Sequence, residues 1–344
     1  MILAVLLSSL ILPINALKAE IISEEEFNNF TTYYYFNPQP DKAPQALEYF
    51  LRSELFRDSI NTNGHVIEMF TYFFGRAANI NPYLIREYEK HYDSEDKFGK
   101  LFLMNIFSIA SDEQNKQFLK VRLTAETDNE MKDFLEQLID ISPLGSERIA
   151  RGVKDYNDLD FMWMEFFVTG DKKPIVKLID VLIWEDRFKN KLLTWISNKH
   201  SKKEIRNLNR LLNVAMINVN LEKGQIGSGG DMDCLYSAFL SNPRMEMQRS
   251  KDGIQIRQAL GLSEEDLFYL ATKGVAMWAL KSNAEQHPKV LEYCKQEFER
   301  RNDKSKIELA IILEVVSRGS IELVPTGKGD VATLKLREKT GFSP

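Results

Sequence analysis

Residues 158–171, DLDFMWMEFFVTGD, constrain the fold more than any other part of the chain. Asp158 is a typical N-cap, and Gly170 can adopt the left-handed conformation that ends a helix. The segment therefore predicts an amphipathic helix from Asp158 to about Thr169. Its apolar residues have the spacing of one buried helix face: Leu159, Met162, Trp163, Phe166 and Phe167.

The same pattern recurs at two other places in the chain. Counted from the first apolar residue of each stripe (i), every copy has an aromatic residue at i+4 and a Phe at i+7. We interpret this recurrence as a degenerate helical repeat. One copy holds Asp231, Met232, Asp233, Leu235, Tyr236, Phe239 and Leu240, and the other holds Val66, Met69, Phe70, Phe73 and Phe74.

Capping residues and prolines mark the starts of further helices. Ser23 and Glu26 have the spacing of a capping box, which predicts a helix toward Tyr35. Proline is tolerated in a first turn because its missing N–H would have no intrahelical partner there. The other expected starts are at residues 41–44 (DKAP), residues 171–174 (DKKP), Pro82 and Pro288.

The chain is predicted to be all-α, an irregular α-solenoid of stacked helical hairpins with a short C-terminal β-hairpin. Asp41 is expected to cap a helix through Phe50 and Leu55, and Phe98 is expected on a buried helix face. Ile321, Leu323, Leu334 and Leu336 alternate with polar residues and predict the hairpin. The remaining predicted helices are 82–92, 94–110, 127–139, 174–184, 190–220, 263–281, 288–300 and 307–317.

The N-terminus has the pattern of a secretory signal peptide, with an apolar run over residues 2–12 and cleavage near Ala16 or Ala19. An uncleaved anchor is the alternative, although a span needs about 20 apolar residues. The expected location is secreted or periplasmic, without a transmembrane span in the mature chain. The predicted parts are a signal peptide (1–19), a helical-hairpin array (20–222), further hairpins (223–318), and a β-hairpin with a tail (319–344).

Composition narrows the class of function. A net charge of −5 over 344 residues disfavours nucleic acid as the main partner. The two cysteines, Cys234 and Cys294, could pair in an oxidising compartment, but spacing alone cannot place them together. Cys294 follows a helical apolar pattern and is expected to be a small core residue.

No catalytic or metal-binding motif stands out, so the sequence predicts no catalytic residue, no metal and no cofactor. Among its four histidines there is no HExxH pattern, and GxSxG is absent. Residues 224–233, GQIGSGGDMD, lack the strand and spacing of a phosphate loop, and a flexible connection explains them. The Asp pairs 158/160 and 231/233 are explained as helix-start residues without a metal.

A basic stretch follows residue 198. It contains Lys199, His200, Lys202, Lys203, Arg206 and Arg210. A solvated helix face explains it, and a site for an acidic partner is the alternative.

Four consecutive aromatic residues, Tyr33, Tyr34, Tyr35 and Phe36, form the candidate binding site. Each residue advances a helix by about 100°, so the four cannot share one face and some must point away from the packed side. Exposed aromatic residues are enriched at interaction hot spots. The alternative is that the cluster covers the end of the helical stack.

Paired amphipathic helices with aromatic-rich faces resemble the α-solenoids of tetratricopeptide or HEAT-like type, without a regular period of about 34 residues. The signal-peptide pattern followed by YYYFNPQPDKAP (residues 33–44) and DLDFMWMEFFVTGD (residues 158–171) resembles uncharacterised secreted helical proteins of bacteria, over residues 30–300. The resemblance implies a scaffold that binds a protein or peptide partner. An envelope hydrolase and a self-associating structural subunit are the alternatives.

Overall fold

A computed structural model describes residues 23–62, 64–110, 113–140, 146–185, 187–214 and 251–318, together with four short strands. It is 83% helical, with 17 helices among the described residues, which confirms the prediction of a mostly helical protein. The predicted signal peptide, the glycine-rich segment, the repeat copy at Asp231 and Cys234 lie outside the described residues.

The chain divides into two compact units. The first comprises residues 1–147 and Phe167–Gly170, and the second comprises Arg148–Phe166 and the chain from Asp171 onward. The boundary predicted near residue 222 lies outside the described residues.

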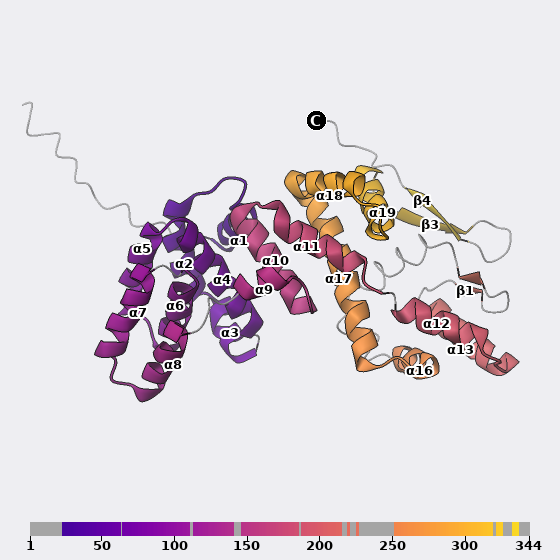
Figure 1. Cartoon of the computed structure of the whole chain (residues 1–344), viewed down its shortest axis with the longest axis horizontal. Coiled ribbons are helices and arrows are strands. Elements are labelled where there is room, and N and C mark those ends of the chain that lie inside the picture. The colour runs from indigo at the N-terminus through magenta and orange to yellow at the C-terminus, as the bar shows by residue number, and fades with distance from the viewer. Residues whose placement is uncertain are drawn as a thin grey trace, which may run out of the picture. The chain divides into compact units, whose positions relative to one another are not determined.

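The first unit is built from eight α-helices and a 3₁₀ turn among its described residues (Figure 1). In chain order they are α1 (Glu24–Tyr33), η1 (Pro40–Lys42), α2 (Ala43–Arg52), α3 (Glu54–Thr62), α4 (Gly64–Ile80), α5 (Tyr83–Tyr92), α6 (Lys97–Ile109), α7 (Glu113–Ala125) and α8 (Asn129–Asp140).

The elements that follow make up the second unit, with α9 and α10 crossing its limits. The helices are α9 (Ser146–Arg151), α10 (Tyr156–Thr169), α11 (Lys172–Leu182), α12 (Arg187–Ser197), α13 (Lys202–Val214), α16 (Lys251–Leu260), α17 (Glu264–Gln286), α18 (Pro288–Arg300) and α19 (Ser305–Arg318). The strands are β1 (Val219–Asn220), β2 (Gln225–Ile226), β3 (Ile321–Pro325) and β4 (Ala332–Leu336).

An aromatic core organises the first unit around α4, which packs against α2, α3, α5 and α6. Phe70, Phe73 and Phe74 of α4 are buried, as the apolar stripe predicted. The ring of Phe50 on α2 lies 4.5 Å from that of Phe70 and 5.4 Å from that of Phe102 on α6. Offset ring pairs at such distances add to the hydrophobic gain from burial.

Gly75 lets α4 and α6 approach closely. A Cβ atom at this position would lie 2.6 Å from Cβ of Ile109 and 3.1 Å from the carbonyl oxygen of Ile106. No larger residue fits there without moving one of the two helices, because the protein interior between them is close-packed.

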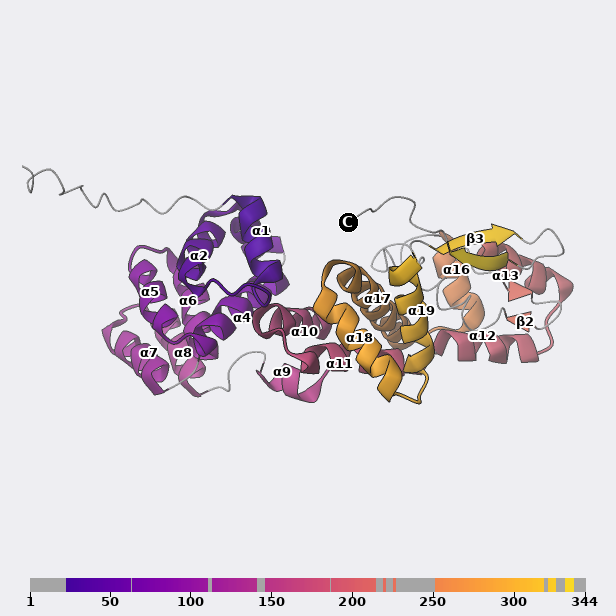
Figure 2. The same ribbon diagram turned by 90° about the horizontal axis from the view of Figure 1, so that it is seen from above.

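In the second unit, α17 packs against α11, α12, α18 and α19. Figures 1 and 2 both show α17 beside α18 and α19. A capping box of Ser263 and Asp266 starts α17, and Cys294 of α18 is buried in the core as predicted.

The helix that dominates the sequence, α10, buries Leu159, Met162, Trp163 and Phe166, four of the five residues of its predicted stripe, whereas Phe167 is half-buried. Phe161 and Val168, outside the stripe, are buried as well, so the burial is not confined to the predicted face. Gly170 follows with a φ of 65°, the expected left-handed end. The predicted N-cap was wrong. Asp155 caps the helix, because its Oδ1 accepts hydrogen bonds from the backbone N–H groups of Asn157 (2.8 Å) and Asp158 (3.1 Å).

Asp158 instead lies inside the first turn of α10 and is almost fully buried. Its carboxylate accepts hydrogen bonds from the guanidinium of Arg151 and from the backbone N–H of Lys154. A buried ion pair with additional hydrogen bonds keeps the charge compensated.

Two predicted long helices are broken at serine caps. The expected helix through Phe50 and Leu55 is split because the hydroxyl of Ser53 donates to the carbonyl of Phe50 and accepts from the N–H of Phe56, which starts α3. Residues 190–220 likewise contain α12 and α13 separated by Ser201, whose backbone N–H and hydroxyl both donate to the Glu204 carboxylate.

Two side chains were misplaced by the sequence pattern. Asp41 does not cap α2, but accepts a hydrogen bond of 2.7 Å from the hydroxyl of Tyr83. Phe98 is 52% exposed, because α6 begins only at Lys97, after the Asp96 cap, and Phe98 lies in its first turn.

β3 pairs antiparallel with β4, with Ile321 opposite Leu336. Residues 326–331 between them lie outside the described residues, so the hairpin stays a prediction. Among the helices that the structure describes, none is both long and apolar enough to cross a bilayer.

Phe50→Ala should destabilise the first unit by about 3–5 kcal/mol, because it empties a fully buried aromatic site. Phe98→Ala removes the same side chain from an exposed position and should change stability by no more than about 0.5 kcal/mol. Denaturant unfolding followed by far-ultraviolet circular dichroism measures both. Equal losses in the two variants would contradict the described core.

Candidate functional site

The aromatic cluster 33–36 begins at Tyr33, the last residue of α1, and continues through the turn that follows, and the structure divides it into two pairs. Tyr34 and Tyr35 are buried, with 3% and 9% exposure, whereas Tyr33 and Phe36 are 37% and 75% exposed. The buried pair belongs to the core, and the exposed pair faces away from it.

Tyr34 packs into the first unit from its edge. Its ring lies 5.3 Å from that of Phe30 and 5.6 Å from that of Phe73, and its hydroxyl accepts a long hydrogen bond of 3.4 Å from Asn81. Burial raises the pKa of Tyr34 to about 12, so its hydroxyl stays protonated at neutral pH.

Tyr35 holds the turn through its backbone. Its N–H donates a hydrogen bond of 2.9 Å to the carbonyl of Phe167, which lies in the last turn of α10. The final carbonyls of a helix lack intrahelical partners, so this bond satisfies one of them. The buried half of the cluster therefore has a structural role.

A cleft of about 330 Å³ opens beside Tyr33 and Tyr34, within the first unit. Phe30, Tyr33 and Tyr34 supply its aromatic wall. Side chains from α1 and from the chain between Asn37 and Gln45 form the rest of the lining. We call this the α1–η1 cleft.

Four amide side chains, Asn29, Asn37, Gln39 and Gln45, line the α1–η1 cleft. None of them makes a side-chain hydrogen bond to another residue in the described part of the chain. Each amide offers both donors and an acceptor, the complement of a peptide group. The cleft is therefore suited to hydrogen-bond a neutral polar ligand.

Two charged residues also line the cleft, Glu26 and Lys42. The Glu26 carboxylate accepts hydrogen bonds from the backbone N–H and the hydroxyl of Ser23, which lower its pKa. Glu26 therefore serves as the capping partner of α1, and its two hydrogen bonds fix one end of the cleft.

A further hydrogen bond anchors η1, which carries the lining residue Lys42, to α5. Tyr83 on α5 donates to Asp41, and this bond is the main reason that the pKa of Tyr83 rises to about 12. Core packing of the aromatic wall and the hydrogen bonds at Glu26 and Asp41 thus fix this part of the chain before any ligand binds. Such preorganisation lowers the entropic cost of binding.

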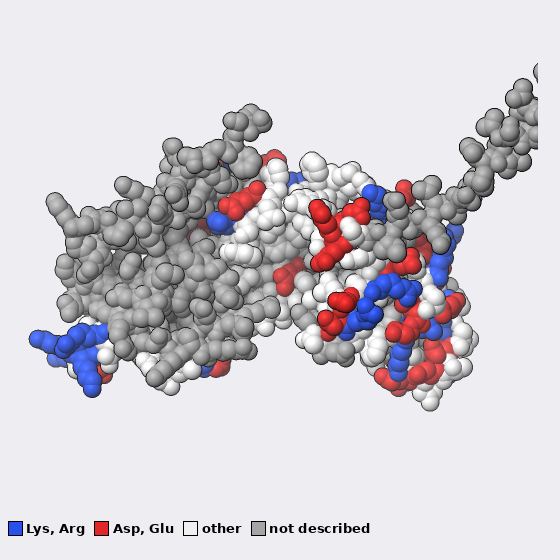
Figure 3. Space-filling view, turned by 180° about the vertical axis from the view of Figure 1, so that it is seen from behind, with Lys and Arg blue, Asp and Glu red and all other residues white. Residues whose placement is uncertain are grey.

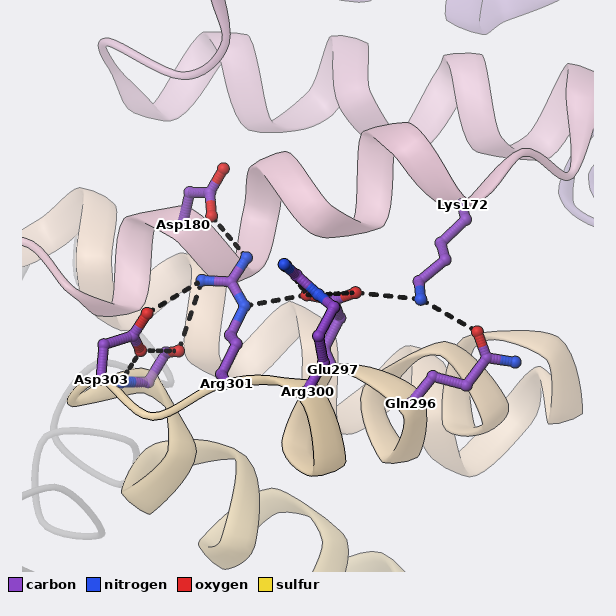
Figure 4. Close-up of polar contacts among 8 residues, drawn as sticks. Lys172, Asp180, Gln296, Glu297, Arg300, Arg301 and Asp303 are labelled. Carbon is purple, nitrogen blue, oxygen red and sulfur yellow. Dashed lines mark hydrogen bonds and ion pairs between the residues drawn. The ribbon is translucent and has the colours of Figure 1, made fainter.

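The second polar cluster is an ion network between α11 and α18, centred on the buried side chains of Glu297 and Arg301 (Figure 4). The side chain of Glu297 is 2% exposed. It lies 2.9 Å from Nζ of Lys172 and 2.9 Å from Nε of Arg301, and Arg301 reaches Oδ1 of Asp180 at 2.5 Å.

Burial alone would raise the pKa of Glu297, but hydrogen bonds from Arg300, Lys172 and Arg301 lower it to about 2. Both carboxylate oxygens are engaged by cations, so Glu297 is a poor proton acceptor. We interpret the network as a structural clamp that joins α11 to α18.

Three of the four described histidines have contacts of their own. His287 is the N-cap residue of α18, is fully buried, and has its pKa lowered by burial. His65 lies 3.9 Å from Glu68, and His200 contacts the carbonyl of Trp195. Within the described ranges, no three His, Cys, Asp or Glu residues are placed to hold a metal ion.

Comparisons with protein-family models, with curated proteins and with solved structures find no match. The sequence singled out the aromatic cluster but missed the four amides beside it. A signal was present, because Asn29, Asn37 and Gln39 flank the cluster. What could not be read was their convergence on one cleft, which depends on how η1 folds back toward α1.

Glu297→Gln should destabilise the protein by about 3 kcal/mol at neutral pH, because Arg301 and Lys172 lose a buried counter-charge. The folded-state pKa of Glu297 lies below its ordinary value of 4.5, so its charge stabilises the fold above about pH 4.5. That contribution is lost as the pH falls toward 2.

Between about pH 4.5 and pH 2, the parent should therefore lose more stability than the Glu297→Gln variant. Melting temperatures of the two proteins, measured as a function of pH, test this. Glu299→Gln is the matched control, because Glu299 is exposed on the same helix. A Glu297→Gln variant with the parent's acid profile would contradict the clamp.

Proposed function

We propose that the protein is a binding scaffold that holds an extended segment of a protein or peptide partner in the α1–η1 cleft. The observation that carries this proposal is the aromatic wall of the cleft beside four side-chain amides without internal hydrogen bonds. Binding sites commonly combine apolar walls with a few convergent polar groups.

The amides and aromatic residues would recognise different parts of the ligand. Amide side chains can pair with the N–H and C=O groups of an extended main chain, independently of its sequence. The faces of Tyr33 and Phe30 can cover a ring or an aliphatic side chain. Phe36, the most exposed large apolar residue of the cluster, does not line the cleft, but it lies between the lining residues Tyr34 and Asn37 in the chain and would add a contact beside it.

The proposal includes the wider architecture expected from the sequence. The helical hairpins would form an irregular α-solenoid, a class whose repeats create extended binding surfaces. The mature chain would act outside the cytoplasm, secreted or periplasmic, after cleavage near Ala16 or Ala19. Amides and aromatic residues make up most of the cleft lining, and its two charges, Glu26 and Lys42, are of opposite sign, which favours a peptide over a chain of phosphates.

A double variant, Tyr33→Ser with Phe36→Ser, should abolish peptide binding and leave the melting temperature within about 2 °C of the parent, since exposed substitutions cost little stability. Binding is measured by fluorescence anisotropy with labelled extended peptides that contain proline or aromatic residues. Phe98→Ser controls for the loss of an exposed aromatic residue elsewhere.

Tyr34→Ser provides the contrasting result. It empties a buried site and should lower the melting temperature clearly. If the double variant is less stable than the parent but still binds peptide, the cluster covers the end of the helical stack and does not bind a partner. If the parent binds no peptide but the double variant differs from it in oligomeric state, the surface serves self-association instead.

A further inference from the structure

A cluster of cations occupies the turn before α13 and the first turns of that helix. Lys199, Lys202, Lys203 and Arg206 are all exposed. Lys202 and Arg206 are four residues apart and share one side of the helix. Lys and Arg side chains gather at this end of the second unit in Figure 3. We call these four residues the basic surface.

One carboxylate, Glu204, lies among the cations of the basic surface, but it forms no ion pair with them. None of its four cations forms an ion pair with a described residue, which is also true of the exposed Lys120, Lys295 and Lys304, but only here in the described chain do four such cations lie within eight consecutive residues. The carboxylate nearest in sequence, Glu204, accepts hydrogen bonds from the backbone N–H and hydroxyl of Ser201. These bonds lower the pKa of Glu204 and assign it to capping the helix.

The backbone beneath the cations is held in place. The ring of His200 stacks on that of Trp195 at 3.7 Å between centroids, with 11° between the planes. The same imidazole lies 2.7 Å from the carbonyl oxygen of Trp195. On the side of α13 away from the basic surface, Leu208 is buried, and α13 packs against α16. The cations are thus presented to solvent by an already folded turn.

We propose that the basic surface binds an acidic segment of a polypeptide partner. The protein carries a net charge of −5, so four unpaired cations in one place run against its overall charge. Carboxylates form charge-assisted hydrogen bonds with Lys and Arg, and such pairs favour rapid, specific encounter.

Other anionic partners fit less well. Basic helices that lie on membranes insert apolar side chains from beside the cations, but here Leu208 is buried and Asn207 is the exposed neighbour of Arg206. Nucleic acid binding relies on many phosphate contacts, and four clustered cations offer only a few of them. A short run of carboxylates matches a surface of this size.

The test uses the full-length chain and a fluorescein-labelled oligoglutamate of about 20 residues, with anisotropy measured at about 50 mM and 300 mM salt to vary screening. The variant Lys202→Gln/Lys203→Gln/Arg206→Gln should bind about tenfold more weakly at low salt, from three lost exposed pairs. Lys120→Gln/Lys295→Gln/Lys304→Gln is the matched control, because it removes three exposed lysines elsewhere for the same change in net charge.

Lys199 precedes α13, so the single variant Lys199→Gln tests the basic surface without changing a residue of the helix. It should weaken binding about twofold, the effect of one exposed pair. Equal weakening in the triple variant and its control, or no binding by the parent at low salt, would overturn the proposal. So would tighter binding to anionic phospholipid vesicles or to single-stranded DNA than to oligoglutamate, because it would identify a different class of partner.

Discussion

The close contact between α4 and α6 at Gly75 is the constraint on which the first unit depends. It places α4 at the centre of the aromatic core, and Phe73 of α4 then supports both Phe30 and Tyr34. Those two rings form part of the wall of the α1–η1 cleft. The shape of the cleft is therefore a consequence of core packing, because a displaced α4 would move the wall.

The second unit relies on buried charge where the first relies on aromatic packing. Glu297 and Arg301 lie between α11 and α18, and Lys273 pairs with the buried Glu308 between α17 and α19. Buried pairs of this kind gain little over apolar packing but are costly to break singly. They favour one arrangement of the helices, since a shifted helix would leave a charge without its partner.

Local signals in the sequence predicted much of this structure. The spacing of Phe70, Phe73 and Phe166 predicted helices and their buried faces, because the 3.6-residue period needs no knowledge of the tertiary fold. The N-cap at Asp158 failed because Asp155 competes for the same role and Arg151 draws Asp158 into an ion pair. Which of two nearby Asp residues caps a helix depends on their contacts in the folded protein, and a pattern of residue types does not show those contacts. The convergence of the four amides was invisible for the same reason, since it arises from η1 folding back beside α1.

The two proposed surfaces obey different physics, and this separates them experimentally. The α1–η1 cleft offers amides and aromatic faces, whose interactions with a neutral peptide are little affected by ionic strength. The basic surface offers exposed cations, and exposed charges are screened over about 8 Å at physiological salt. A partner held mainly by the cleft should therefore stay bound as salt rises, and one held by the basic surface should be released. A partner that uses both would show a partial loss, with the residual affinity removed by substitutions at Tyr33 and Phe36.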